Sequence, residues 1–248
     1  MAIQCWCQTD VGLRRETNQD SFLIDESLGL YVVADGMGGH RGGEVASKIA
    51  VETLQAIVKS ELERAGTRKT NPRVLLTKAY EEASHRIYDR SIEPNSNLQG
   101  MGTTLVAALV QNGKISVANV GDSRAYLFTR GELWQLTEDH SLINEQIRAG
   151  IIAEGDLEKL APRNVITRSV GFERDVQVDI LERDLEPGEL VMMCSDGLSG
   201  LVTDAKISEF CKTRKPSELV SLLVDEAKKN GGDDNVTVMV LYAQSRSN

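Results

Sequence analysis

The chain has 248 residues, of which 41% are hydrophobic and 26% are charged, a composition typical of a globular protein. Its net charge of −9 and pI of about 5.0 argue against nucleic acid or an anionic membrane as a partner, because neither would attract an acidic surface. No apolar run approaches the roughly 20 residues of a membrane span, and the N-terminus has no basic segment followed by an apolar stretch, so we expect a cytoplasmic protein.

The first hundred residues predict three strands followed by two helices. Ile3, Cys5 and Cys7 alternate with polar residues, as in an edge or half-buried strand. Apolar runs and helical spacings then predict, in order, strands at 21–25 and 30–34 and helices at 44–65 and from 73 onwards. Asn71 and Pro72 open the second helix. The spacing of Cys5 and Cys7 is not that of a zinc site, so we interpret the four cysteines as buried, reduced thiols.

The remaining residues predict mainly antiparallel strands. Asn112-Gly113 is a strong hairpin signal between strands at 103–111 and 114–121. A second hairpin is predicted around Gly131. Residues 138–172 are less regular, with short helices at 142–149 and 154–160, and are expected to form a mobile flap. The last predicted elements are a strand at 177–185 that turns at 186–188 and returns at 189–196, helices at 205–212 and 217–229, and a strand at 235–243.

This order of elements predicts the α+β class. Helices separated from antiparallel hairpins are typical of it. Two antiparallel sheets packed face to face, each covered by a pair of helices, would bury every apolar face, giving a four-layer αββα sandwich. We expect one domain over 1–243, with 244–248 as a free tail.

Four acidic residues lie next to buried strands, and they suggest a metal site. Asp35 and Asp196 each end an apolar run, Asp122 follows a strand, and Asp234 precedes one. An Asp-Gly pair alone is a common turn. Four carboxylates brought together could not all ionise without cations, and an oxygen-rich set without His or Cys favours Mg²⁺ or Mn²⁺. Gly36, which has no Cβ, lets a backbone carbonyl approach an ion closely.

A phosphate ester is a substrate that suits such ions. Two-metal hydrolytic sites activate a water between ions that are roughly 3.5–4 Å apart. Arg14 and Arg15 lie in the loop between the first two strands, and an arginine there could hold phosphate oxygens by paired hydrogen bonds. His40, in the glycine-rich loop, could protonate the leaving alkoxide. His140 is interpreted as structural, and the glycine run lacks the pattern of a nucleotide-binding loop.

Eight motifs, in the same order and over nearly the whole chain, resemble the bacterial PPM family of metal-dependent protein phosphatases, type 2C. They are RETNQD (15–20), VVADGMGGHRGGE (32–44), MGTT (101–104), NVGDSRAY (119–126), DHS (139–141), RNVITRSVG (163–171), CSDGLSGLV (194–202) and GGDDNVTVMV (231–240). The resemblance implies the αββα sandwich, and hydrolysis of phosphoserine and phosphothreonine in proteins by a metal-activated water, without a phosphoenzyme.

The resemblance also implies roles for particular residues. Asp35 bridges two Mn²⁺ or Mg²⁺ ions, and the Gly36 carbonyl binds the second. The other implied roles are metal ligation by Asp196 and Asp234, a third ion at Asp122 with Asp196, a phosphate clamp at Arg15, and support of the metal ligands by Asp20, Gln19 and Asn235. The flap at 138–172 is implied to lie beside the active site.

Two positions depart from the family pattern. Gln19 stands where some members have Glu, which predicts weaker metal binding there. Met37 stands where eukaryotic relatives have their proposed general acid, so a role for His40 would be shifted along the loop. Two alternatives stay open: the same chemistry on a small phosphate ester, and a pseudophosphatase that binds phosphoproteins without catalysis. The expected partners are phosphorylated proteins and a cognate Ser/Thr kinase, and the expected state is a monomer.

Overall fold

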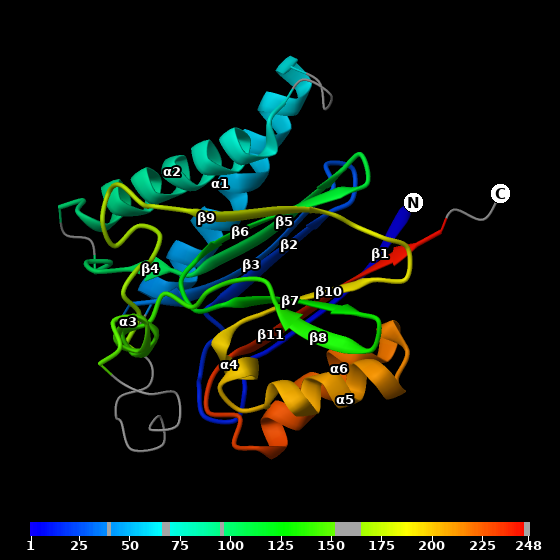
Figure 1. The fold of residues 1–248 in the computed structure, drawn as a ribbon. Helices are drawn as coiled ribbons and strands as arrows, with labels where there is room; N and C mark the ends of the chain where they lie inside the picture. The colour runs from blue at the N-terminus through cyan, green and yellow to red at the C-terminus, as the bar shows by residue number, and fades with distance from the viewer. Residues whose placement is uncertain (39–40, 66–69, 95–96, 152–164, 246–248) are drawn as a thin grey trace.

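Two antiparallel sheets lie face to face, and helices cover the outer face of each one (Figure 1). The computed structural model describes residues 1–38, 41–65, 70–94, 97–151 and 165–245. Buried apolar residues form three layers, one between the sheets and one between each sheet and its helices. The predicted α+β class and the αββα sandwich are therefore confirmed.

The first sheet has six strands and carries two long helices. Its strand order is β2-β3-β5-β6-β9, and β4 pairs with β3. The elements are β2 (Asp20–Asp25), β3 (Leu30–Met37), β4 (Gly102–Thr103), β5 (Leu105–Gln111), β6 (Lys114–Val120) and β9 (Asp179–Asp184), with helices α1 (Gly42–Ala65) and α2 (Pro72–Ser91). The Asn71 side chain caps α2 by accepting hydrogen bonds from two backbone N–H groups, as its predicted role requires.

The second sheet has five strands in the order β1-β11-β10-β7-β8. Its strands are β1 (Ala2–Asp10), β7 (Arg124–Thr129), β8 (Glu132–Gln135), β10 (Leu190–Cys194) and β11 (Val236–Gln244). The helices α4 (Asp196–Ser199), α5 (Asp204–Thr213) and α6 (Pro216–Lys229) lie on its side of the molecule (Figure 1). One further helix, α3 (Leu142–Arg148), belongs to the predicted flap.

Alternation along β3 explains how an acidic residue comes to lie between the sheets. Leu30, Val32 and Ala34 belong to the core beneath the helices, whereas Tyr31 and Val33 belong to the core between the sheets. Successive side chains of a strand point to opposite faces. Asp35 therefore follows Tyr31 and Val33 onto the face that looks toward the other sheet.

Local turn chemistry predicted the hairpins correctly. Asn112 and Gly113 both have positive φ, 53° and 79°, as a two-residue hairpin turn requires. The predicted pairing of the strands at 177–185 and 189–196 was wrong, because β9 pairs with β6 in one sheet and β10 pairs with β7 and β11 in the other. The chain crosses between sheets at this turn.

Three strand or helix boundaries also differ from the prediction. The strand expected to end at 34 continues to Met37, because β4 pairs with Gly36 and Met37. Asp196 begins a short helix that was not predicted. Gln244, expected in the tail, pairs with Ala2 at the end of β11. The predicted helix at 154–160 lies outside the described residues, and the assignment of 1–243 to one domain stays a prediction.

The cysteines are free thiols, as predicted, but their burial differs. Cys194 and Cys211 are buried, whereas Cys5 and Cys7 are only partly buried, against the core between the sheets. The reason is that β1 is an edge strand. Over the part of the chain that the structure describes, none of the helices has the length and apolar character needed to cross a bilayer.

Candidate active site

Two carboxyl groups, one buried and one partly buried, face each other across neighbouring strands of the first sheet. Asp20 at the start of β2 is the direct partner of Asp35 in β3. Side chains of directly opposed residues in an antiparallel pair project from the same face. Asp20 and Asp35 therefore both enter the space between the sheets, at the end where β2 begins.

Hydrogen bonds from the other half of the molecule hold Asp20 in place. Ser195 Oγ donates to Asp20 Oδ2 at 2.8 Å, and Thr237 Oγ1 donates to the same oxygen at 2.6 Å. The second oxygen, Oδ1, is buried and has no hydrogen-bond partner among the described residues. The pKa of Asp20 is raised to about 7, chiefly by burial and in part by Asp196 and Asp234, against the opposing effect of the two hydroxyl donors.

Three loops bring the other predicted carboxylates to the same place. Asp122 lies in the turn between β6 and β7, Asp196 begins α4 directly after β10, and Asp234 precedes β11. The last two loops touch, because a Cβ at Gly197 would collide with the carbonyl oxygen of Asn235. A glycine after Asp196 therefore lets the start of α4 approach the start of β11 closely.

The electrostatics show that these carboxyl groups interact. Burial, followed by Asp20 and Asp196, raises the pKa of Asp35 well above its usual value. Burial and then Asp234 raise the pKa of Asp196, and burial and then Asp196 raise that of Asp122 to about 7. Carboxyl groups whose ionisation is opposed by burial and by neighbouring carboxylates attract protons or metal cations.

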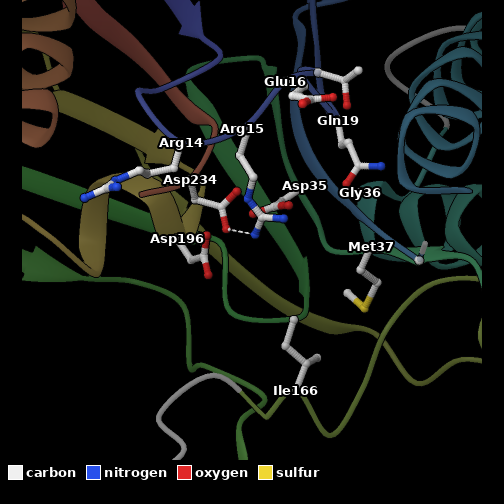
Figure 2. Close-up of a pocket in the computed structure, with 12 residues that line it drawn as sticks. Arg14, Arg15, Glu16, Gln19, Asp35, Gly36, Met37, Ile166, Asp196 and Asp234 are labelled. Atoms are coloured by element: carbon white, nitrogen blue, oxygen red, sulfur yellow. Dashed lines mark hydrogen bonds and ion pairs between the residues drawn. The ribbon is translucent and has the colours of Figure 1, made fainter. Parts of the chain in front are cut away.

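Arg15 is the basic group in this cluster. Its Nη2 donates to Asp234 Oδ2 at 2.7 Å, and the guanidinium lies beside Asp35 and Asp196 (Figure 2). Arg14 points to the side and lies 3.7 Å from Asp233. The loop sequence alone left Arg14 and Arg15 as alternatives, and the family resemblance implied Arg15. The structure brings Arg15 to the carboxylates.

Three of the carboxylates, Asp35, Asp196 and Asp234, line an open cavity of about 670 Å³ together with Arg15. Its wall also includes Gly36, Gln19, Met37 and Ile166. Gly36 has no room for a side chain, because a Cβ there would collide with the carbonyl oxygen of Gly43 at the start of α1. The close approach of β3 to α1 is therefore possible only with glycine at this position.

Asn235 connects the loop between β1 and β2, which carries Arg15 and is called the arginine loop, to the second sheet. Its Oδ1 accepts a hydrogen bond from the Gln19 backbone N–H at 2.7 Å, and its Nδ2 donates to the carbonyls of Val11 and Thr17 at 2.9 and 3.0 Å. Three hydrogen bonds from one buried side chain thus hold both ends of the loop that carries Arg15.

His140 is buried and hydrogen-bonded, in agreement with a structural interpretation. Its Nδ1 accepts a hydrogen bond from the Gly121 backbone N–H at 3.0 Å, and its Nε2 lies 3.3 Å from Asp179 Oδ2. It therefore supports the turn that carries Asp122. His40, predicted as a general acid, lies outside the described residues.

Sequence reasoning missed the hydroxyl groups that support the carboxylates. Ser195 and Thr237 bind Asp20, and Thr104 Oγ1 accepts a hydrogen bond from the Asp35 backbone N–H at 3.0 Å. One signal was present in the sequence: Thr237 is a polar residue in the otherwise apolar strand 236–241. A buried hydroxyl in such a strand needs a polar partner.

The residues fit hard divalent cations. The cluster offers carboxylate oxygens, and buried Oδ1 atoms of Asp20, Asp122 and Asp196 have no hydrogen-bond partner in the described part of the chain. Within that part, no three His, Cys, Asp or Glu side chains enclose a single point closely enough to hold an ion alone. An ion here would complete its coordination with backbone carbonyls and water, which is typical of Mg²⁺.

The chain is similar to known proteins over most of its length. Residues 13–220 match the family model described as Protein phosphatase 2C. The chain is 37% identical over 238 residues to the serine/threonine phosphatase stp of Listeria monocytogenes serotype 4b (strain F2365), covering 94% of this chain and 93% of the relative.

Solved structures share the fold over almost the whole chain. The serine/threonine phosphatase PstP/Ppp of Mycobacterium tuberculosis superposes with a TM-score of 0.90 at 31% identity, covering 99% of this chain and 100% of that one. The catalytic domain of PstP in complex with two manganese ions gives 0.85 at 30% identity, covering 98% and 99%.

The fold and site define the class of αββα proteins that hold an acidic, cation-binding cluster between two antiparallel sheets. The chain belongs to the protein phosphatase 2C family within that class, as the match over 13–220 and the 37% identity show. The resemblance to the PPM family drawn from its motifs is thereby confirmed.

Proposed function

We propose that this protein is a metal-dependent protein serine/threonine phosphatase. The observation that carries the proposal is a cluster of carboxyl groups, of which Asp35, Asp196 and Asp234 line an open cavity of about 670 Å³ beside Arg15. Within the described residues, the buried Oδ1 atoms of Asp20, Asp122 and Asp196 have no hydrogen-bond partner. The Listeria relative is named a serine/threonine phosphatase, and the PstP catalytic domain binds two manganese ions. Family membership and the oxygen-only donor set support the same chemistry here.

The ions would be held by residues of β3 and of the two loops that meet at Gly197. We assign Asp35 to both central ions, the Gly36 carbonyl to one of them, and Asp196 and Asp234 to the other. Asp122, with Asp196, would hold a third ion. When bound, Mn²⁺ or Mg²⁺ supplies Lewis acidity and a water whose pKa is low enough to give hydroxide near neutral pH.

The chain's own groups bind and orient the phosphate. Arg15 points into the cavity, and its fork of N–H donors matches two phosphate oxygens. Its present partner, Asp234, holds the guanidinium beside the cavity until an anion arrives. Asp20, Gln19 and Asn235 act indirectly: Asp20 supports the two acidic loops, and the bond between Asn235 and Gln19 positions the arginine loop. His40 stays a proposed general acid.

The test measures hydrolysis of p-nitrophenyl phosphate and of a phosphothreonine peptide, each with Mn²⁺, Mg²⁺ or EDTA. We expect activity with the metals and none with EDTA, and a higher kcat/KM on the peptide. Activity that survives EDTA would contradict the metal mechanism. Hydrolysis of p-nitrophenyl phosphate alone would support a small phosphate ester as substrate, and peptide binding without turnover would support a pseudophosphatase.

Asp35→Asn is the variant that tests the assignment of the bridging carboxylate. It keeps the side-chain shape and removes the charge, so we expect turnover to fall by orders of magnitude and metal affinity, measured by calorimetry, to fall with it. An unchanged metal affinity would show that Asp35 is not a ligand. Phosphoproteins and a cognate Ser/Thr kinase as partners, a signalling role, a cytoplasmic location and a monomeric state belong to the same proposal.

A further inference from the structure

A second cavity of about 480 Å³ opens beside the first. It is formed mainly by residues 166–177 and by Met37. Met37 and Ile166 line both cavities, so the two share a wall. In Figure 2 these two side chains lie on the side of the site away from Arg14. A chain that leaves the first cavity over Met37 enters the second one.

The second cavity combines apolar side chains with acidic ones. Phe172 is 62% exposed and lines the cavity with Val176, Met37 and Ile166. An exposed aromatic ring of this kind offers a surface on which the methylene groups of a long side chain can pack. Two acidic residues, Glu173 and Asp175, line the same cavity.

The described residues that line the cavity carry a net negative charge, with Arg168 set against Glu173 and Asp175. Among the described residues that line it, the one arginine is Arg168, which already pairs with Asp179 Oδ1 at 2.9 Å and donates to the Gln177 carbonyl at 3.3 Å. Asp175 lies 3.1 Å from His85 Nε2. Glu173 has no ion-pair partner among the described residues. A cation that binds at Glu173 would therefore meet a carboxylate with no ion-pair partner in the described part of the chain, in a cavity that Phe172 also lines.

Hydrogen bonds to β4 and α2 hold the segment 170–173 of the cavity wall in place. Val170 exchanges two backbone hydrogen bonds with Thr103 of β4, at 2.9 and 3.0 Å. Ser84 of α2 accepts from the Gly171 N–H at 3.0 Å and donates to the Glu173 carbonyl at 2.9 Å. Because β4 pairs directly with the end of β3 that carries Gly36, the second cavity is built onto the strand of the active site.

We propose that this second cavity binds an arginine or lysine side chain that flanks the phosphorylated residue in the substrate polypeptide. The inference rests on the proposed phosphatase function. An extended chain advances about 3.3–3.6 Å per residue, so a side chain within a few positions of the phosphoresidue reaches the neighbouring cavity. The methylene stem packs on Phe172, and the cationic head lies at Glu173 and Asp175.

The test is a set of phosphothreonine peptides that carry a single arginine, alanine or glutamate at each position within three residues of the phosphate. At one position or two adjacent positions, we expect kcat/KM to be higher for arginine than for alanine by roughly two- to five-fold, the effect of one exposed charge pair. Glutamate at that position is expected to be worse than alanine. Equal rates at all positions would overturn the inference.

Reversing the charge of Glu173 tests whether the second cavity is the source of the arginine preference. In Glu173→Lys the arginine-to-alanine ratio of kcat/KM is expected to fall to about one or below, and in Glu173→Gln to fall part of the way. The matched control is Glu132→Lys, an exposed site on β8 in the other sheet, which is expected to keep the wild-type ratio. Because the ratio is taken within each variant, a loss of folded protein cancels. An unchanged ratio in both Glu173 variants would overturn the assignment.

Hydrolysis of p-nitrophenyl phosphate distinguishes a failure of the proposed flanking site from a failure of the proposed phosphatase function. This substrate has no flanking residue, so its metal-dependent hydrolysis by the wild type tests the phosphatase chemistry alone. If it is hydrolysed and the peptides show no arginine preference, the flanking site is wrong and the phosphatase function stands. If neither this ester nor any peptide is hydrolysed with metal present, the proposed function itself fails.

Discussion

The stability of the metal-free protein should fall as the pH rises from 5 to 8, and Asp20 should account for much of that fall. Burial raises its pKa from the ordinary 3.8 to about 7. Between these two values the folded state holds a proton that the unfolded state has already released. The unfolded state therefore binds fewer protons, and the free energy of unfolding decreases with pH across this window.

The magnitude follows from the size of the pKa change. One pH unit corresponds to about 1.4 kcal/mol, so the interval from 5 up to the folded pKa of about 7 gives a loss of about 3 kcal/mol for Asp20 alone. In a chain of this size 1 kcal/mol corresponds to about 2–4 °C in Tm, so we expect a decrease of about 6–12 °C. His140 acts in the opposite direction up to pH 6.5, because burial lowers its pKa.

The assay is thermal unfolding followed by circular dichroism, in EDTA, at half-unit steps from pH 5 to 8. Asp20→Asn isolates the residue, because its amide oxygen can still accept from Ser195 and Thr237 while its charge is gone. We expect a flatter pH profile and a higher Tm at pH 8 than in the wild type. Addition of Mn²⁺ should flatten the wild-type profile as well, because cations favour the ionised carboxylates.

A matched control lies at the other end of β2. Hydrogen bonds from Ser27 and Gln55 lower the pKa of Asp25, so this group is ionised in both states above pH 5. Asp25→Asn should therefore leave the slope of the profile unchanged. A slope in Asp20→Asn equal to that of the wild type would refute the reasoning, since it would mean that Asp20 is not protonated in the folded protein near pH 6.

Three further predictions concern single positions. Arg15→Ala should mainly raise KM for the phosphopeptide, and an effect confined to kcat would contradict a ground-state phosphate clamp. Gly36→Ala should destabilise the protein by about 1–3 kcal/mol in urea unfolding, because its Cβ collides with the Gly43 carbonyl; an unchanged midpoint would show that β3 and α1 can separate freely. Asn71→Ala should cost about 1 kcal/mol through loss of the α2 cap without changing kcat, and a lower kcat would mean that α2 acts on the site.

Turns and helix starts that are determined by residues adjacent in the sequence could be predicted from the sequence. Asn112-Gly113 defines its turn by its own backbone preferences, and Asn71-Pro72 begins α2 through contacts within the first turn. The pairing of β9 and β10 could not be predicted in this way. Each strand pairs with strands distant in the chain, so the short turn between them carries no information about which sheet each one joins.

In the candidate site, too, some residues could be predicted from local sequence patterns and others depend on contacts between distant parts of the chain. The recurrence of Asp-Gly after apolar strands pointed to Asp35 and Asp196, and the family motifs pointed to Arg15. The bonds that hold Asp20 could not be read from the sequence, because its partners Ser195 and Thr237 lie 175 and 217 residues away. Whether a buried hydroxyl supports a carboxylate or caps a backbone group depends on the packing of the two sheets.

Buried carboxylates link the stability of this protein to its affinity for cations. In the absence of ions, burial and mutual repulsion raise the pKa values of Asp20, Asp35 and Asp122, and ionising them destabilises the fold. A cation that neutralises the cluster removes this destabilisation, so the same free energy appears as binding affinity. Protons and metal ions therefore compete for one set of oxygens. Variants that relieve the repulsion, such as Asp20→Asn, should gain stability without metal and lose stabilisation by Mn²⁺ to a similar extent.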